Sequence, residues 1–183
     1  MADTAAPFSW PVRVYWEDTD AGGVVFYANY LKFFERARTE WLRQLGRSVP
    51  AAGADDTTVC CSRADAAGVS SSPDEGFSQQ ALREQTGAIF IVSHTEVRHL
   101  APARLDDELR ITVELTDCGR ATMSFAQQAW CGDRLLAEGR IRVGCVDASS
   151  WRPRRIPELV MAHIAPTSSH TAPDTALQHR PAP

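Results

Sequence analysis

The sequence is poor in lysine and has no long apolar run. Lys32 is the only lysine among 183 residues, so a mechanism that needs a catalytic lysine would have a single candidate. No stretch approaches the roughly 20 apolar residues that span a bilayer. The first residues also lack the basic segment and apolar run of a secretory signal. We therefore expect a cytoplasmic protein without a membrane span.

Cysteine usage and charge exclude further classes. The five cysteines are an odd number at irregular spacing, without a Cys-x-x-Cys pair: Cys60, Cys61, Cys118, Cys131 and Cys145. This pattern argues against a disulfide framework and against a zinc site, so we expect free thiols, no metal and no cofactor. The net charge of -4 argues against nucleic acid as a partner, because a surface that binds nucleic acid is normally basic.

Apolar periodicity in the first part of the chain predicts one strand and one long helix. Residues 11–17 alternate between apolar and polar side chains, with Trp16 on the apolar face, which is typical of a half-buried strand. From 29 to 45 apolar residues recur every three or four positions, which predicts a largely buried helix. Asn29 suits its N-cap, and Gly46 suits its C-terminal stop.

The second part of the chain is rich in strand patterns. Residues 78–86 predict a short helix capped by Ser78, and another short helix is expected after Pro157. Strands are predicted at 88–100, 108–115, 120–130 and 134–146, joined by short turns where the chain forms a meander. In the last strand these residues should share one face: Leu135, Ala137, Ile141, Val143 and Cys145. One buried helix beside an antiparallel sheet is an α+β layout.

We expect a single domain over residues 8–165 with a mobile insertion at 47–76. The insertion is dominated by Ala, Ser, Gly, Asp and Pro and contains no aromatic residue, Leu, Ile or Met. Such a segment cannot bury enough surface to offset its ordering entropy. Residues 166–183, with four prolines and one leucine, are predicted to be a disordered tail.

The densest polar cluster is EDTDAGG, from Glu17 to Gly23, between the first strand and the long helix. One interpretation is a solvated turn with caps. However, Gly22 and Gly23 would let the backbone approach a ligand closely, and the helix start that follows offers free amides for an anion or a developing oxyanion. A carboxylate beside such amides can serve acyl transfer as a nucleophile or a base.

The stretch PVRVYWEDTDAGGVVFYANYLKFFERARTEWLRQL at 11–45 resembles the opening of the 4-hydroxybenzoyl-CoA thioesterase family, and most of all its Tol-Pal system-associated acyl-CoA thioesterases. GFSQQALREQTGAIFIV and HLAPARLDDELRI continue the resemblance, which covers roughly 11–46 and 77–160. It implies a hotdog fold, in which a curved antiparallel sheet wraps around one long central helix.

The resemblance also implies site residues. The last acid of the motif, Asp20, would be the catalytic carboxylate, and the backbone amide of Tyr27 would polarise the carbonyl. Similar sequences often carry His at that place, so the Tyr27 ring itself is not expected to be essential. Gly22, Gly23 and Val24 would contact the substrate.

Hydrolysis of a short-chain or aromatic acyl-CoA is the implied activity, with acyl carrier protein thioesters as a further substrate class. Hotdog proteins build their sites at a two-fold interface, so the resemblance also implies a dimer or a homotetramer. In addition, a one-layer sheet should leave an outer apolar face that needs a partner. An alternative is a scaffold that binds acyl carriers with little turnover. A hotdog hydratase or dehydratase would need a histidine in the motif region, and none occurs between residues 1 and 93.

The remaining charged candidates have structural interpretations. Glu17 and Asp18 are interpreted as turn residues. His94 and His99 are five positions apart on one strand, which places them on opposite faces and argues against a shared metal. Three arginines of the long helix could contact CoA phosphates, but a structural role is favoured: Arg36, Arg38 and Arg43.

Overall fold

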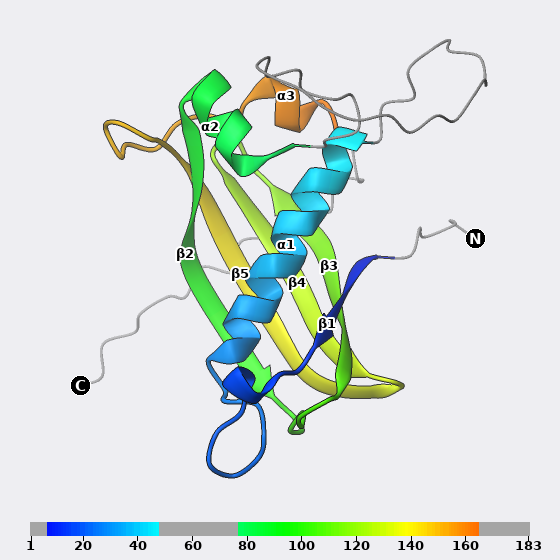
Figure 1. The fold of residues 1–183 in the computed structure, drawn as a ribbon. Helices are drawn as coiled ribbons and strands as arrows, with labels where there is room; N and C mark the ends of the chain where they lie inside the picture. The colour runs from blue at the N-terminus through cyan, green and yellow to red at the C-terminus, as the bar shows by residue number, and fades with distance from the viewer. Residues whose placement is uncertain (1–6, 48–76, 165–183) are drawn as a thin grey trace, which may run out of the picture.

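The computed structural model describes residues 7–47 and 77–164, in which one long helix lies across one face of a five-stranded sheet (Figure 1). The elements are β1 (Phe8–Arg13), a 3-10 turn (Trp16–Asp18), α1 (Asn29–Arg47), α2 (Gln79–Thr86), β2 (Ala88–His99), β3 (Glu108–Cys118), β4 (Thr122–Cys131), β5 (Arg134–Asp147) and α3 (Glu158–Met161). The predicted insertion, apart from Arg47, and the predicted tail lie outside the described residues.

The strands are antiparallel in the order β1-β3-β4-β5-β2. β3, β4 and β5 form the predicted meander, and Gly132 adopts a φ of 56° in the turn between β4 and β5. β2 precedes this meander in sequence but joins its far side, next to β5. The sheet curves around α1 in Figure 1, so the predicted α+β layout of a sheet wrapped around one helix is observed.

The core lies between α1 and the inner face of the sheet. Phe33, Phe34 and Ala37 of α1 are fully buried, as the helical periodicity predicts. Gly139 of β5 permits the closest approach, because a Cβ atom there would lie 2.8 Å from the ring of Phe34. Trp41 adds an edge-on contact with Phe125 of β4, with 5.1 Å between ring centroids.

The first strand is shorter than predicted. β1 ends at Arg13 rather than at residue 17, and Trp16 is 78% exposed instead of facing the core. The reason is local: the Asp18 carboxylate accepts a hydrogen bond from the Tyr15 N–H (3.0 Å), and the Asp18 N–H donates to the Tyr15 carbonyl. These bonds turn the chain out of the strand.

The ends of the helices agree with the sequence in part. Asn29 is the first residue of α1 rather than its cap, and α1 continues through Gly46 to Arg47. The Ser78 cap is confirmed, because its hydroxyl accepts a hydrogen bond from the Ala81 N–H. The short helix after Pro157 is confirmed as α3.

The face prediction for the last strand is wrong at its start. Leu135 is only partly buried, whereas Leu136 is 1% exposed. Trp130 pairs with Leu135 and Ala129 pairs with Ala137, so Leu136 is the extra residue of a β-bulge. A bulge changes which side chains face the core, and simple alternation cannot reveal it.

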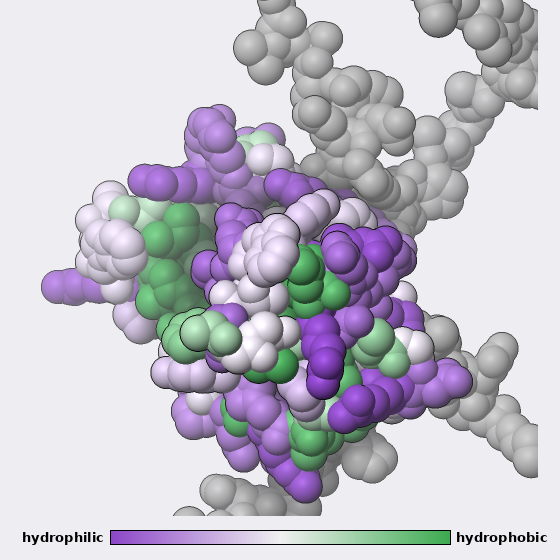
Figure 2. Space-filling model, turned by 60° about the horizontal axis from the view of Figure 1, so that its bottom comes forward, coloured by the Kyte–Doolittle hydropathy of each residue, from purple (hydrophilic) through white to green (hydrophobic). Residues whose placement is uncertain are grey.

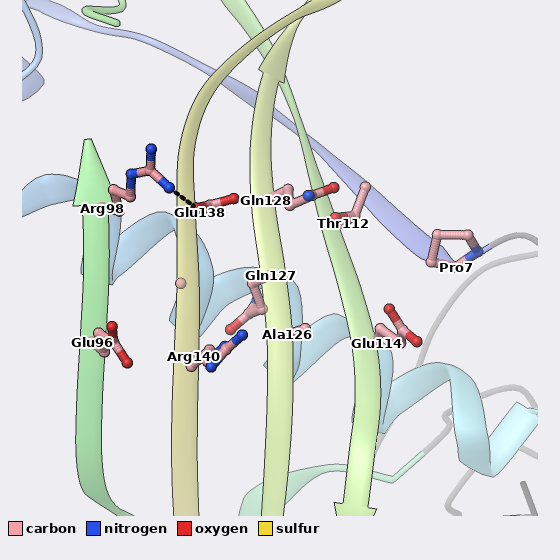
Figure 3. Close-up of a pocket in the computed structure, with 11 residues that line it drawn as sticks. Pro7, Glu96, Arg98, Thr112, Glu114, Ala126, Gln127, Gln128, Glu138 and Arg140 are labelled. Atoms are coloured by element: carbon pink, nitrogen blue, oxygen red, sulfur yellow. Dashed lines mark hydrogen bonds and ion pairs between the residues drawn. The ribbon is translucent and has the colours of Figure 1, made fainter. Parts of the chain in front are cut away.

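The outer face of the sheet is polar, which corrects the expectation of an apolar face. Figure 3 shows charged side chains of β2, β3 and β5 lining a hollow of about 430 Å³. Arg98 and Glu138 form an ion pair there with an N–O distance of 3.2 Å. The labelled residues also include Glu96, Glu114, Gln128 and Arg140. A partner for this face is therefore not required by exposed apolar surface.

Two expectations from the sequence concern membrane-spanning segments and the state of the cysteines. None of the helices in the described ranges combines the length and hydrophobicity needed to cross a membrane. The cysteines that the structure describes are free thiols: Cys118, Cys131 and Cys145. Cys60 and Cys61 lie outside the described residues.

Candidate active site

The loop between β1 and α1 is anchored by Asp18. This residue is 3% exposed, and its backbone carbonyl accepts hydrogen bonds from the Phe26 N–H (2.8 Å) and from the Asn29 side-chain amide (2.9 Å). Its carboxylate is engaged with Tyr15, as described above. The turn interpretation of Asp18 is thus supported, because its polar groups fasten both ends of the loop.

Asp20 lies on the exposed part of this loop. Its carboxylate Oδ1 accepts a hydrogen bond from the Gly22 N–H at 2.8 Å, and its own N–H donates to the Val24 carbonyl at 2.9 Å. A Cβ atom on Gly22 would lie 3.1 Å from Oδ1, and Gly23 has a φ of 72°, which disfavours a side chain. Both glycines therefore permit the conformation that holds the carboxylate.

The backbone amide of Tyr27 is unpaired at the start of α1. Around it, the Phe26 N–H donates to the Asp18 carbonyl and the Asn29 N–H donates to the Phe26 carbonyl, whereas the Ala28 N–H, like that of Tyr27, has no acceptor among the described residues. Within residues 7–47 and 77–164, no acceptor is found for the Tyr27 N–H. Free N–H groups and the partial positive charge at a helix start favour an anion or a developing oxyanion.

A pocket of about 290 Å³ opens beside this helix start. Its lining residues are Val25, Tyr27, Tyr30, His99, Leu100, Ala101 and Pro102. The Tyr30 hydroxyl accepts a hydrogen bond from the Ala103 N–H (3.2 Å), and burial raises the pKa of this phenol. Tyr30 therefore stays neutral at physiological pH and fixes the pocket floor.

This end of the molecule carries exposed aromatic side chains. Trp16 is 78%, Tyr27 66% and Phe26 42% exposed. Figure 2, which turns this end toward the viewer, shows apolar groups interrupting a polar surface. Exposed rings near a pocket are typical of a surface that binds a ligand or a partner.

The predicted residues occupy two adjoining places. Tyr27 lines the pocket, whereas Asp20, Gly22, Gly23 and Val24 belong to the loop just before it and are not lining residues. The loop is tied to the segment that follows the pocket, because Val24 bridges to Arg104.

His99 is a pocket residue that sequence reasoning missed. The prediction of opposite faces is confirmed, since His94 pairs with Arg142 on the outer face and His99 pairs with Ala137 on the inner face. From the sequence, the two histidines were weighed only as a possible pair of metal ligands. One feature of the sequence could have pointed to His99: it lies at the end of a predicted strand, next to the loop that follows.

The arginines of α1 have separate environments. Arg38 donates a hydrogen bond to Gln127 Oε1 at 2.5 Å, and Arg43 forms an ion pair with Glu40. Arg36 is exposed. The structural role favoured for Arg38 and Arg43 is supported, because both guanidinium groups are bonded within the fold.

In the described ranges, no three His, Cys, Asp or Glu side chains cluster as metal ligands.

Comparison with known proteins decides the family. The family model described as "Thioesterase-like superfamily" matches residues 14–164. The chain belongs to the thioesterase-like superfamily. The hotdog arrangement expected from the sequence is thereby confirmed, and so is the prediction of a thioester hydrolase at the level of this superfamily.

Individual members of the superfamily are similar over nearly their whole length. The chain is 39% identical over 158 residues to the acyl-CoA thioester hydrolase YbgC of Escherichia coli O6:H1. The matched stretch covers 86% of this chain and 95% of that protein. It is 36% identical over 155 residues to the Haemophilus influenzae acyl-CoA thioesterase YbgC, covering 85% and 92%.

Solved structures agree on the fold. A probable thioesterase from Bartonella henselae superposes with a TM-score of 0.63 at 27% identity, over 83% of this chain and 100% of that one. A Staphylococcus aureus protein solved in complex with CoA gives a TM-score of 0.66 at 15% identity, over 97% and 95%, which shows a common fold alone.

Proposed function

We propose that this protein hydrolyses acyl-CoA thioesters, with Asp20 as the catalytic carboxylate and the Tyr27 N–H as a donor to the oxyanion. The observation that carries the proposal is the unpaired Tyr27 amide at the start of the 19-residue helix α1. The loop that holds Asp20 is fastened to the same helix start through Asp18 and Asn29. The superfamily membership of the chain supports the reaction class.

The chemistry needs one carboxylate and one donor. Asp20 would attack the thioester carbonyl carbon, releasing CoA thiolate and forming a mixed anhydride that water then hydrolyses. Alternatively, Asp20 would take a proton from a water molecule that attacks the same carbon. In both routes the carbonyl oxygen becomes negative, and the Tyr27 N–H would stabilise that charge.

The acyl group is proposed to be short-chain or aromatic. The pocket beside Tyr27 has a volume of about 290 Å³, just below the usual range of ligand sites, about 300–1,000 Å³, which favours a small acyl group. The names of the YbgC relatives specify acyl-CoA, which supports CoA as the carrier. Acyl carrier protein is the second carrier to test. The Tol-Pal association implied by the sequence resemblance, and the cytoplasmic location expected from the cysteine pattern, are also part of the proposal.

Self-association is part of the proposal. β2 is an edge strand of 12 residues, and its Ile91 and Val92 are 39% and 51% exposed. A long edge strand with exposed apolar side chains favours pairing with another strand. We expect a second copy to pair there, giving a dimer or a tetramer, which light scattering of the full chain would measure.

The decisive experiment compares Asp20→Asn with Glu17→Gln. Both remove a charge from the same motif, but only Asp20 has the proposed chemical role. Thiol release should be measured over a panel of acyl-CoA and acyl carrier protein thioesters. We expect Asp20→Asn to lower kcat by a factor on the order of 100 or more, and Glu17→Gln to retain nearly full activity.

Other outcomes are informative. Near wild-type turnover by Asp20→Asn would remove Asp20 from the mechanism. Tight binding of acyl carrier protein by a wild-type protein that releases no thiol would favour the scaffold function instead.

A further inference from the structure

The imidazole of His99 faces the helix start at which the thioester is proposed to bind. His99 is the last residue of β2, and its ring is exposed on the inner face of the sheet. Its centroid lies 6.4 Å from the Tyr27 ring and 5.1 Å from the Tyr30 ring, both in edge-on arrangements. The residue whose amide is the proposed oxyanion donor therefore lines the same pocket as an imidazole.

The ring nitrogens of His99 are available. Across residues 7–47 and 77–164, His99 makes ring contacts, but no hydrogen-bond partner for either nitrogen is found. Because the side chain is exposed, these nitrogens can bond water or a ligand.

The titratable surroundings of His99 are simple. From α1 and the residues just before it, the phenols of Tyr27 and Tyr30 face the ring, and burial raises the pKa of Tyr30, with Asp107 adding to the effect. The loop after β2 contributes Leu100, Ala101 and Pro102, and β5 contributes Ala137 as the paired residue. No carboxylate, lysine or arginine lines this pocket of the described chain. Of the residues that line this pocket, His99 therefore carries the side chain that most often serves in general acid–base catalysis.

We propose that His99 is the proton-transfer residue of this site, an inference that rests on the proposed thioesterase function. Asp20 attacks the thioester carbon, the C–S bond breaks, and protonated His99 gives its proton to the departing CoA sulfur. The neutral imidazole then removes a proton from the water that attacks the acyl-aspartyl anhydride. The bond to Asp20 breaks, the free acid leaves, and both side chains return to their starting states with one water consumed.

The position of His99 fits both halves of this cycle. The leaving sulfur and the attacking water both act on the carbon whose oxygen is held at the Tyr27 amide. His99 lines the same pocket as Tyr27, so the proposal gives it both transfers, because Asp20 is occupied by the acyl group in the intermediate. General acid–base transfer of this kind contributes typically 100- to 10,000-fold.

The test compares His99→Phe with His94→Phe. Phenylalanine at 99 keeps the aromatic contact with Tyr30, and His94 lies on the same strand but on the outer face. We expect His99→Phe to lower kcat on the order of 100-fold with little change in melting temperature, and to alter the pH dependence of kcat/KM. His94→Phe should leave both unchanged.

Chemical rescue separates proton transfer from packing. His99→Ala should regain part of its turnover when free imidazole is added, and the gain should follow the unprotonated imidazole concentration. A merely structural His99 would give no rescue. Unchanged kcat and pH profile in His99→Phe would overturn the proposal. If wild type releases no thiol, the thioesterase function itself fails; if Asp20→Asn is inactive and His99→Phe is not, only the role of His99 fails.

Discussion

The Arg38 guanidinium donates a hydrogen bond to Gln127 Oε1, joining the central helix to the middle of the sheet. Gln127 is 1% exposed, and its Nε2 donates to the Phe34 carbonyl at 3.0 Å. Burial lowers the pKa of Arg38 to about 10, still far above neutral, so the group stays charged inside the fold. Glu35 stabilises this charge through space, but Gln127 supplies its hydrogen-bond acceptor, which makes Gln127 sensitive to substitution.

Gln127→Leu should therefore destabilise the protein although it adds an apolar side chain to the core. Loss of the acceptor leaves the Arg38 charge poorly compensated, so we expect the free energy of unfolding to fall by about 2–4 kcal/mol. Urea denaturation would measure it. Gln128→Leu, on the outer face of the same strand, should cost less than about 1 kcal/mol. Equal costs would contradict a special role for the Arg38–Gln127 bond.

Gly139 should tolerate no side chain. A Cβ atom there would lie 2.8 Å from the Phe34 ring and 3.1 Å from Ile141, both within the packed core. Gly139→Ala should lower the free energy of unfolding by about 1–3 kcal/mol through overpacking. Gly144→Ala, five residues later on β5, meets nothing within 4 Å and should change it by less than about 0.5 kcal/mol. The thermal unfolding of the two variants measures the difference.

Periodicity predicted the elements well, because α1 and most strands bury one face each. It failed where a local contact overrides the period. The Asp18 carboxylate ends β1 early and exposes Trp16, and a bulge exchanges Leu135 for Leu136 in the core. The polar outer face was missed because each strand was read alone, without the register that places Arg98 opposite Glu138.

The candidate site was predicted in part for a similar reason. Asp20 and Tyr27 belong to one contiguous motif, so a family resemblance in that motif could indicate them together. His99 comes from β2, 72 positions after Tyr27 in the chain, and only the fold brings the two rings within 6.4 Å. A residue that joins a site through topology leaves no local pattern in a single sequence.

Asp147 should make stability sensitive to acid. Its carboxylate accepts hydrogen bonds from the Ser149 hydroxyl first, and from the Ser150 N–H and hydroxyl, which hold its pKa well below the usual range. Because the pKa is depressed in the folded state, the stabilisation is present above the unfolded value of about 4 and is lost as the pH falls below it.

The expected result for Asp147→Asn is a lower melting temperature than wild type from pH 5 to 8, by a constant difference. That difference should shrink as the pH is reduced from 4 toward 2, because the wild-type carboxylate then loses its advantage. Asp133→Asn, in the exposed turn before β5, is the matched control and should show little difference at any pH. A constant difference for Asp147→Asn down to pH 2 would show that charge is not the cause.

Asn29 should couple the catalytic loop to the central helix. Its buried side-chain amide donates to the Asp18 carbonyl at 2.9 Å, and Asp18 is two residues before the proposed catalytic carboxylate. Asn29→Ala removes that bond, so we expect the free energy of unfolding to fall by about 1–2 kcal/mol. Turnover should fall further than stability explains, by roughly 10-fold, because small displacements of a catalytic group are costly. Gly139→Ala has a comparable expected stability cost, and its added Cβ would meet Phe34 and Ile141 rather than the loop, so it is the control and should keep its kcat. Thiol release by the two variants should be measured well below both melting temperatures. Equal kcat values for Asn29→Ala and Gly139→Ala would mean that the Asn29 bond serves stability alone.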